Sequence, residues 1–482
     1  NPQKIYNATT TAAASDITLT NQVSGEALQL SNAAATSSKN VGSYSISNLS
    51  GVTISDQVGA SASSGALAAN YALTGGTHSF AINPKAVNIL GSQQYNGSTN
   101  IAASDISGIT GTVNTETLTM SSGLGTTSSA NVGAYNLTDT SAGTLALANG
   151  SNGGLAANYT LTGGTQTYTV TQRVLNSSGS KTYDANTNAL AGAITLSNLV
   201  SGEALNHSGT ATTSSANAGS YTISNLSGIS IADGSGGAAS NYTLTGGTHN
   251  FTVNRRVVGV SGTRLYDATT NAIASDLSAH ANLVGTQTLT LSGTGTIASK
   301  DVGSSKTVSV GTLALGNGSN GGLAANYTLT GGTHQLTVNQ RPLNATLARQ
   351  YDGTTTSAGS TLSSLDALQG GETLTMTGSG TAASANVANG ITMSSNGNLA
   401  LVNGTGAASN YSLNSTVINI AKRVLNSSGS KTYDANTNAL AGAITLSNLV
   451  SGEALNHSGT ATTSSANAGS YTISNLTGIT IA

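Results

Sequence analysis

Short runs of alternating apolar and polar residues, separated by turn residues, are the main pattern along this chain. An alternation of period two is typical of half-buried strands. Between residues 173 and 254 the runs predict strands at 173–176, 181–183, 193–196, 204–207, 210–213, 221–224, 228–231, 241–245 and 248–254. No apolar stripe with helical spacing stands out. The pattern therefore predicts an all-β fold.

The strand pattern repeats with a long period. Tyr followed by Asp or Asn occurs at Tyr6, Tyr95, Tyr183, Tyr266, Tyr351 and Tyr433, so the successive spacings are 89, 88, 83, 85 and 82. A second marker, Asn-Tyr, places its tyrosine at Tyr71, Tyr159, Tyr242, Tyr327 and Tyr411. Residues 173–226 and 423–476 are identical, which points to duplication of one unit. This period favours separate sandwich-sized modules over the shorter coils of a β-helix.

Six copies of a β-sandwich-like module account for the whole chain. The predicted boundaries are 1–83, 84–171, 172–254, 255–339, 340–421 and 422–482. The first copy lacks a strand equivalent to 173–176, and the sixth stops before its Asn-Tyr segment. A window from a longer chain is the simpler expectation from these ends, and strand donation between molecules is the alternative.

A hairpin is predicted around the Gly-Gly pair that follows each Asn-Tyr marker. Gly246-Gly247 suits a two-residue turn that needs positive φ at both centres. This register places Tyr242 opposite Phe251, with both side chains on the core face. The same rule pairs residues in the other copies, as Tyr71 with Phe80, Tyr159 with Tyr168, Tyr327 with Leu336, and Tyr411 with Ile420.

The segment between consecutive modules is more constant in length than the modules. Counted along the sequence, the step from Asn-Tyr to the next Tyr-Asp is 24, 24, 24, 24 and 22, whereas the step across the module body varies between 59 and 65. Flexible linkers would give the opposite result. We expect the last strand of one copy to run almost directly into the next, with Arg255 and Arg256 bracing the joint and Tyr266-Asp267 opening the following module. The array is therefore expected to be an elongated rod.

Composition narrows the possible functions. Only 7% of the residues are charged, the net charge is −2, and there is no Cys or Trp. A nucleic-acid partner would need a basic face, which 15 Lys and Arg spread over 482 residues do not supply. No apolar run reaches the length of a transmembrane helix. Exposed tyrosines could stack on sugars, so the candidate partners are a polysaccharide or other copies of the chain.

Four repeated motifs are candidate chemical sites. The aspartates of Tyr-Asp could bind Ca²⁺, but Asn7 and Asn96 replace them in two copies, so an Asx turn fits better. The repeated Gly-Glu pairs, such as Gly202-Glu203, are interpreted as turns with solvated charges. The histidines that follow Gly-Gly-Thr are interpreted as side chains beside the turn. The glycine-rich run at 316–321 leads into a strand, so it is not a dinucleotide motif. No catalytic, cofactor-binding or metal-binding residue is predicted, and the chain is not expected to be an enzyme.

The chain resembles the YDG and MBG-type repeats of large bacterial exoproteins of the filamentous-haemagglutinin-like, two-partner-secreted class. The residues that carry the resemblance are Lys181-Thr182-Tyr183-Asp184-Ala185, Tyr351-Asp352-Gly353-Thr354-Thr355, Lys300-Asp301-Val302-Gly303 and Asn326-Tyr327-Thr328-Leu329. The resemblance implies a secreted or cell-surface stalk that projects an adhesive region or builds a biofilm matrix. An array of weak carbohydrate-binding modules that act by avidity is the alternative, as is a filament subunit completed by strand donation.

Overall fold

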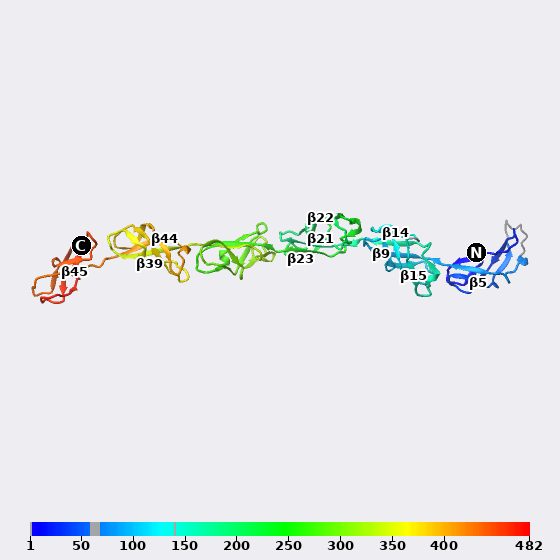
Figure 1. Cartoon of the computed structure of the whole chain (residues 1–482), viewed down its shortest axis with the longest axis horizontal. Coiled ribbons are helices and arrows are strands. Elements are labelled where there is room, and N and C mark those ends of the chain that lie inside the picture. The colour runs from blue at the N-terminus through cyan, green and yellow to red at the C-terminus, as the bar shows by residue number, and fades with distance from the viewer. Residues whose placement is uncertain (1, 58–67, 139–140) are drawn as a thin grey trace. The chain divides into compact units, whose positions relative to one another are not determined.

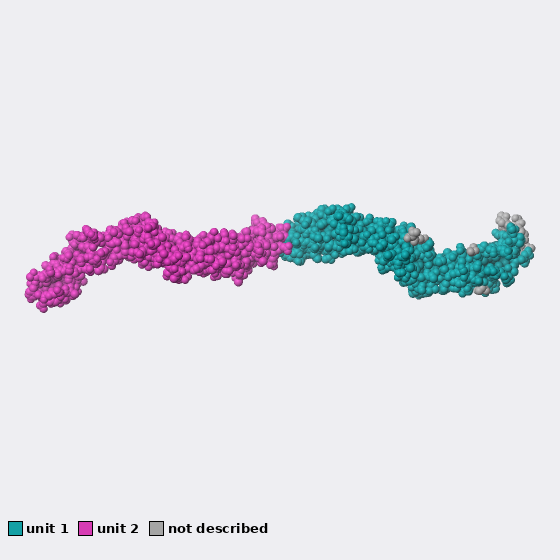
Figure 2. Space-filling view, viewed as in Figure 1, with its two compact units in different colours: residues 1–181, 186–253 teal, residues 182–185, 254–482 magenta. Residues whose placement is uncertain are grey.

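A computed structural model of the chain describes residues 2–57, 68–138 and 141–482. Its regular structure consists of β-strands and single-turn 3-10 helices, and it confirms the expected all-β architecture of tandem modules (Figure 1). The chain divides into two compact units, residues 1–181 with 186–253 and residues 182–185 with 254–482 (Figure 2). Copies are numbered below by the boundaries drawn from the sequence.

The fourth copy illustrates how one copy is built. Its strands are β27 (Arg256–Val257), β28 (Gly259–Leu265), β29 (Asn271–Ile273), β30 (Ala279–Ala281), β31 (Leu289–Ser292), β32 (Thr294–Ile297), β33 (Gly303–Ser309), β34 (Ala314–Asn317), β35 (Tyr327–Thr328) and β36 (His334–Asn339), with single turns η7 (Ala274–Asp276) and η8 (Ala324–Asn326). A six-stranded sheet has the order β29-β32-β33-β36-β28-β30, and β31-β34 and β27-β35 form two small ribbons. Alternate residues of β36 are buried, as a half-buried strand requires.

The first long strand and the last strand of a copy are parallel neighbours. In the fourth copy β28 pairs with β36 in parallel, with Gly262 opposite Leu336. The same parallel pairing joins β9 (Asn88–Gln94) to β17 (Gln166–Thr171) and β37 (Arg341–Gln350) to β44 (Tyr411–Ala421). Because both strands run in one direction, the chain enters a copy at one end of its sheet and leaves at the other.

At four of the five joints the strands of consecutive copies are nearly continuous, as expected, whereas residues 422–425 at the last joint lie outside any strand. Only Gln172 separates β17 from β18 (Arg173–Val174), and only Gln340 separates β36 from β37. The short strand after each joint pairs in parallel with the Asn-Tyr segment of the copy it enters: Arg173 lies opposite Tyr242 and Arg256 opposite Tyr327.

The third and sixth copies contain the identical stretches 173–226 and 423–476. The remaining strands of the third copy are β19 (Asn176–Thr182), β20 (Asn188–Leu190), β21 (Ile194–Ser197), β22 (Leu205–Thr213), β23 (Gly219–Asn225), β24 (Ile229–Asp233), β25 (Tyr242–Thr243) and β26 (His249–Asn254). Those of the sixth are β45 (Asn426–Gly429), β46 (Asn438–Leu440), β47 (Ile444–Ser447), β48 (His457–Thr463), β49 (Ile473–Asn475) and β50 (Ile479–Ile481).

The predicted hairpin register is wrong in every copy. Phe251 lies opposite Tyr221 of β23, not opposite Tyr242, which pairs in parallel with Arg173. The partners elsewhere also differ from the prediction: Phe80 lies opposite Tyr44, Tyr168 opposite Tyr135, Leu336 opposite Lys306, and Ile420 opposite Ala388. In the fifth copy Tyr411 and Ile420 belong to one strand, β44, so the chain makes no turn there. Tyr71 lies in a loop ahead of β7 (Ser79–Asn83).

The geometry of the two glycines explains the error. Gly246 has a φ of +86°, but Gly247 does not have positive φ, so the pair cannot form the turn that was predicted. The turn instead centres on Thr245 and Gly246. Gly247 serves a different purpose, because a Cβ at that position would lie 1.9 Å from the carbonyl oxygen of Leu175. The second glycine therefore lets the chain pass close to the start of the copy.

Candidate functional site

The repeated site is a contact between consecutive copies that we call the tyrosine joint. It consists of the tyrosine of Tyr-Asp or Tyr-Asn from one copy, and the tyrosine of Asn-Tyr with a Glu or Gln from the next copy. The first tyrosine follows the first long strand, at the end where the chain leaves the copy. The other two residues lie where the chain enters the following copy, so the nearly continuous strands bring all three together.

The joint between the second and third copies shows the geometry. The rings of Tyr95 and Tyr242 meet edge to face, with centroids 5.4 Å apart and an interplanar angle of 79°. Glu203 lies between the two hydroxyls: Tyr95 donates to Oε1 at 2.5 Å and Tyr242 donates to Oε2 at 2.6 Å. The backbone N–H of Val200 donates to the Tyr242 hydroxyl at 3.0 Å. One carboxylate is thus shared by phenols from two copies.

The same arrangement recurs along the chain. Three other edge-to-face pairs have centroid distances of 5.3 Å: Tyr6–Tyr159, Tyr183–Tyr327 and Tyr266–Tyr411. Their bridging side chains are Glu116, Gln287 and Glu372. At the joint of the fifth and sixth copies Tyr351 donates to Glu453 at 2.5 Å. Edge-to-face aromatic pairs add about 0.5–1.5 kcal/mol beyond their buried area.

Two joints differ from this pattern in charge. Gln287 replaces the carboxylate between the third and fourth copies, and its amide both donates to Tyr183 at 3.0 Å and accepts from Tyr327 at 2.5 Å. Between the fourth and fifth copies Lys300 adds an ion pair with Glu372 at 2.6 Å. Its ammonium group also lies 5.8 Å from the centre of the Tyr266 ring. The aromatic contact is common to all four pairs, whereas the charge is not.

Burial sets the protonation states in the joints. Burial, and then the neighbouring carboxylate Glu203, raise the pKa of Tyr95 to about 12. Burial also raises the pKa of Tyr411 to about 12, and the hydrogen bond to Glu372 adds to this. Burial alone would raise the pKa of Glu372, but the hydrogen bonds from Lys300, Tyr266 and Tyr411 hold it below its ordinary value. At neutral pH the joint of Tyr266 and Tyr411 therefore pairs two neutral phenols with the carboxylate of Glu372.

Backbone contacts brace the joint from both sides. The asparagine before the second tyrosine reaches back to the preceding copy, as Asn241 accepts from the N–H of Val132 at 2.9 Å and donates to Asn131 at 2.9 Å. Arginines of the joining strand donate to the carbonyl of the first tyrosine in four joints, from Arg173, Arg256, Arg341 and Arg423 to Tyr95, Tyr183, Tyr266 and Tyr351. Arg256 thus makes the bracing contact expected of it, and Arg173, Arg341 and Arg423 make the same contact at their joints. Arg255 is exposed.

The hydrophobic core continues through these joints. One buried cluster contains Tyr6 and Phe80 of the first copy together with Val87 and Tyr159 of the second. Another contains Tyr95 and Tyr168 of the second copy with Leu175 and Tyr242 of the third. Five of the tyrosines predicted to line module cores are buried, namely Tyr159, Tyr168, Tyr242, Tyr327 and Tyr411, whereas Tyr71 is only partly buried. The buried marker tyrosines lie at the contact between copies.

The Gly-Glu pairs lie in turns, as expected, with positive φ at Gly202 and Gly371, but their charges are not all solvated. Glu372 is 9% exposed, and Glu116, which follows Thr115 at the same point of the repeat, is 6% exposed. Burial of a carboxylate is costly unless it is paired or hydrogen-bonded, and here phenols supply the hydrogen bonds. The sequence contains a signal for this role, because a Glu or Gln recurs at the same point of each copy in a chain with few charges. These residues are Glu26, Glu116, Glu203, Gln287, Glu372 and Glu453.

The remaining motifs have structural roles. Asp267 and Asp352 accept from the N–H two residues later, in Thr269 at 3.0 Å and Thr354 at 2.9 Å, which confirms the expected Asx turn. Asn96 makes the same turn with Ser98 at 2.9 Å. The imidazole of His249 lies beside its turn, with Nε2 2.8 Å from the carbonyl oxygen of Leu244.

Within residues 2–57, 68–138 and 141–482, no group of three or more His, Asp or Glu side chains is placed to hold a metal ion. Over the same ranges no helix has the length and apolarity needed to cross a membrane. The joint tyrosines that could stack on sugars are largely enclosed; Tyr266 and Tyr327, for example, are buried.

Comparison with known proteins identifies the repeat. The model of the YDG domain family matches residues 1–78, 165–249, 252–338 and 333–418. No curated protein matches the sequence. The matched ranges contain the Tyr-Asp or Tyr-Asn markers of the first, third, fourth and fifth copies, and they cover well over half of the chain. The chain therefore belongs to the YDG domain family.

Proposed function

We propose that this chain is a stalk or fibre segment of a secreted or cell-surface bacterial protein, either an adhesin or a biofilm-matrix component. Its role is to hold a binding region away from the cell. The observation that carries this proposal is the tyrosine joint, which recurs with one geometry between successive copies.

A stalk needs joints that resist bending, and three properties of the tyrosine joint supply that resistance. The two rings and the shared carboxylate are contributed by different copies, so bending would separate an aromatic pair and break two hydrogen bonds. The core is continuous across the joint, so bending would also expose apolar surface. The covalent link is a strand rather than a flexible linker.

Small-angle X-ray scattering of the whole chain tests the proposal. Six copies, each about 30 Å across, placed end to end give a maximum dimension on the order of 200 Å. We expect that dimension for the unaltered chain and a lower apparent stiffness for the double variant Tyr95→Ala and Glu203→Ala. A Gly-Ser pair inserted after Asn254 should also bend the chain while the copies stay folded.

Tyr433→Ala is the matched control, because Tyr433 is 62% exposed and its removal should leave the scattering unchanged. A compact particle for the unaltered chain would contradict the proposal. Cell fractionation and surface labelling of the producing bacterium test the location, and the protein is expected outside the cell.

A further inference from the structure

Three of the four aromatic pairs place two phenols around one carboxylate. In the joint of the second and third copies, Tyr95 and Tyr242 donate to the two oxygens of Glu203 at 2.5 and 2.6 Å. The joint of the first and second copies has the same arrangement around Glu116, and the joint of the fourth and fifth copies has it around Glu372. Because both hydroxyls of a pair reach one carboxylate, the hydroxyl-bearing ends of the two rings lie side by side.

The same geometry brings together the ring carbons through which tyrosine radicals form bonds. Loss of one electron and one proton from a phenol leaves a radical whose unpaired electron is spread over the oxygen and the ring carbons beside it, which include both Cε atoms. The rings of Tyr95 and Tyr242 have centroids 5.4 Å apart and an interplanar angle of 79°. The rings of a biaryl are also twisted out of one plane, and a Cε–Cε bond requires these centroids to approach by less than the length of that bond. A small shift of the side chains is therefore sufficient for coupling.

The bridging carboxylate supplies the proton acceptor that such an oxidation needs. A phenol that loses an electron must also lose its proton, and a base within hydrogen-bond reach accepts that proton directly. Glu203 is only partly buried, so it can pass each proton from Tyr95 or Tyr242 on to water. Both rings are buried, and enclosure keeps competing reactants away from the first radical until the second ring is oxidised.

We propose that the tyrosine joints are oxidative cross-linking sites, at which a bond between two tyrosine rings joins consecutive copies covalently. Two one-electron oxidations, each with loss of the phenolic proton, convert a pair into two phenoxyl radicals. A Cε–Cε bond then forms, each of these carbons gives up its proton, and each oxygen regains one. The pair loses two electrons and two protons in total. Hydrogen peroxide, acting through a haem peroxidase, accepts them and becomes two molecules of water. This modification requires the joint alone and does not depend on a role as a stalk.

The four pairs differ in their proton acceptor, so they should differ in rate. Although burial alone would raise the pKa of Glu372, the hydrogen bonds from Lys300 and the two phenols lower it, which makes this carboxylate a weaker base. Gln287 accepts a hydrogen bond, but its amide oxygen does not take up a proton at neutral pH. We therefore expect cross-linking to be fastest at Glu203 and Glu116, slower at Glu372 and slowest at Gln287.

The test treats the full 482-residue chain with hydrogen peroxide and a haem peroxidase, at a protein concentration low enough to suppress links between molecules. Fluorescence of the linked phenols follows the reaction, and peptide mass spectrometry assigns each cross-link. We expect peptides that join Tyr95 to Tyr242, lighter than the sum of the two parts by two hydrogen atoms. Tyr95→Phe keeps a ring in the joint and should remove this cross-link alone.

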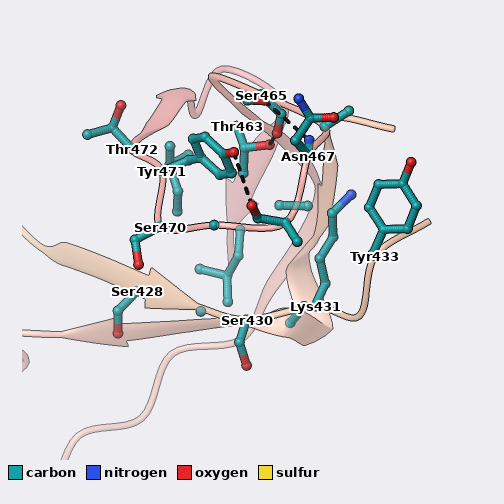
Figure 3. A pocket seen from close by; sticks show the side chains of 18 of the residues that line it. Ser428, Ser430, Lys431, Tyr433, Thr463, Ser465, Asn467, Ser470, Tyr471 and Thr472 are labelled. Atoms are coloured by element: carbon teal, nitrogen blue, oxygen red, sulfur yellow. Dashed lines mark hydrogen bonds between the residues drawn. The ribbon is translucent and has the colours of Figure 1, made fainter. Parts of the chain in front are cut away.

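Two exposed tyrosines are the comparison for the enclosed pairs. Tyr433 and Tyr471 are 62% and 42% exposed, and Figure 3 shows them toward opposite sides of a pocket in the sixth copy. Both rings are open to the oxidant, but they do not face each other across a shared carboxylate. They should be oxidised without being joined to each other.

Glu203→Gln separates the role of the carboxylate from that of the ring contact. The joint bridged by Gln287 keeps the edge-to-face geometry, with centroids 5.3 Å apart, so the variant is expected to keep its ring contact as well. The rate of cross-linking between Tyr95 and Tyr242 should fall by on the order of tenfold or more, because the positioned base is lost. The other joints should be unchanged. Gln287→Glu is the converse variant and should raise the rate at its own joint.

Two results would overturn the proposal. One is an equal rate at the joints bridged by Glu203 and Gln287, because the carboxylate would then not be the proton acceptor. The other is an oxidised chain in which Tyr95 and Tyr242 carry no mutual cross-link, whether the linked phenols then arise between molecules or not at all.

Discussion

The third and sixth copies are the same sequence over residues 173–226 and 423–476, yet their side chains differ in environment. Tyr183 is 3% exposed and its counterpart Tyr433 is 62% exposed. Ser177 is buried, while its counterpart Ser427 is only partly so. In the third copy these side chains are covered by the last strand β26 and, beside Tyr183, by the joint residues Gln287 and Tyr327. Local sequence therefore determines which residues can be buried, and the neighbours decide which ones are.

The largest expected difference between the two copies is at the joint tyrosine. Tyr183→Ala removes an enclosed ring, and we expect a loss of roughly 3–5 kcal/mol in the local free energy of opening. Tyr433→Ala removes an exposed ring and should change it by less than about 0.5 kcal/mol. Site-resolved hydrogen exchange measures both, since a chain of several copies need not unfold in a single step. Equal losses in the local free energy of opening for Tyr183→Ala and Tyr433→Ala would show that the contacts of Tyr183 in the joint do not stabilise the third copy.

The shared carboxylate should give the next largest difference. Glu203→Ala leaves two phenols of consecutive copies without their common acceptor, which is expected to cost about 1–3 kcal/mol. Glu453→Ala affects one phenol at an exposed position and should cost less. Hydrogen exchange of the backbone N–H of Val200, which donates to Tyr242, reports the first change. If Glu203→Ala exchanged like the unaltered chain, the rings alone would hold the joint.

Lowering the pH should distinguish the contribution of a carboxylate charge to a joint from the contribution of aromatic packing. The pKa of Glu372 is held below its ordinary value, so its stabilising contribution is full above that value and is lost as pH falls through the lowered pKa. Gln287 does not titrate. We therefore expect the Tyr266–Tyr411 contact to loosen in acid before the Tyr183–Tyr327 contact does. NMR of selectively labelled tyrosine rings follows both contacts.

The control for this effect is Glu372→Gln. This change should make the joint between the fourth and fifth copies as insensitive to acid as the joint between the third and fourth copies. The effect is expected to be the smallest of the three, because the aromatic contact persists after protonation. Simultaneous loosening of both contacts in the unaltered chain would assign the acid response to the copies themselves rather than to Glu372.

Much of the fold follows from patterns that the sequence displays directly. Alternating strands and the long, regular period of the tyrosine markers predicted tandem β modules. The constant distance between the two kinds of marker predicted nearly continuous strands at the joints. The Asx turn could be predicted because Asp and Asn exchange at one position, as at Asp267 and Asn96. The bracing role of Arg256 could be predicted from its place beside the expected crossover, whereas the adjacent Arg255 is exposed.

The errors concern partners that are distant in sequence. The hairpin register assumed that strands on either side of Gly246-Gly247 pair with each other, but Phe251 pairs with Tyr221 and Tyr242 with Arg173. A local turn rule has no information on a strand at the far end of the same copy. The glutamates were missed for the same reason: Glu203 bridges a tyrosine 108 residues away in sequence to one 39 residues away. The sequence pattern identifies both tyrosines as markers, but it does not show that they are in contact.

The division of the joint between successive copies has a consequence for how such chains change length. Each copy contributes the first tyrosine to the copy after it and the second tyrosine with its Glu or Gln to the copy before it. Any copy can therefore follow any other, and the new junction created by deletion or duplication of one whole period has matching halves. Unequal recombination between near-identical stretches, such as 173–226 and 423–476, would yield alleles of different length in which every junction keeps its complementary residues. Length polymorphism is thus tolerated by the same geometry that stabilises each junction.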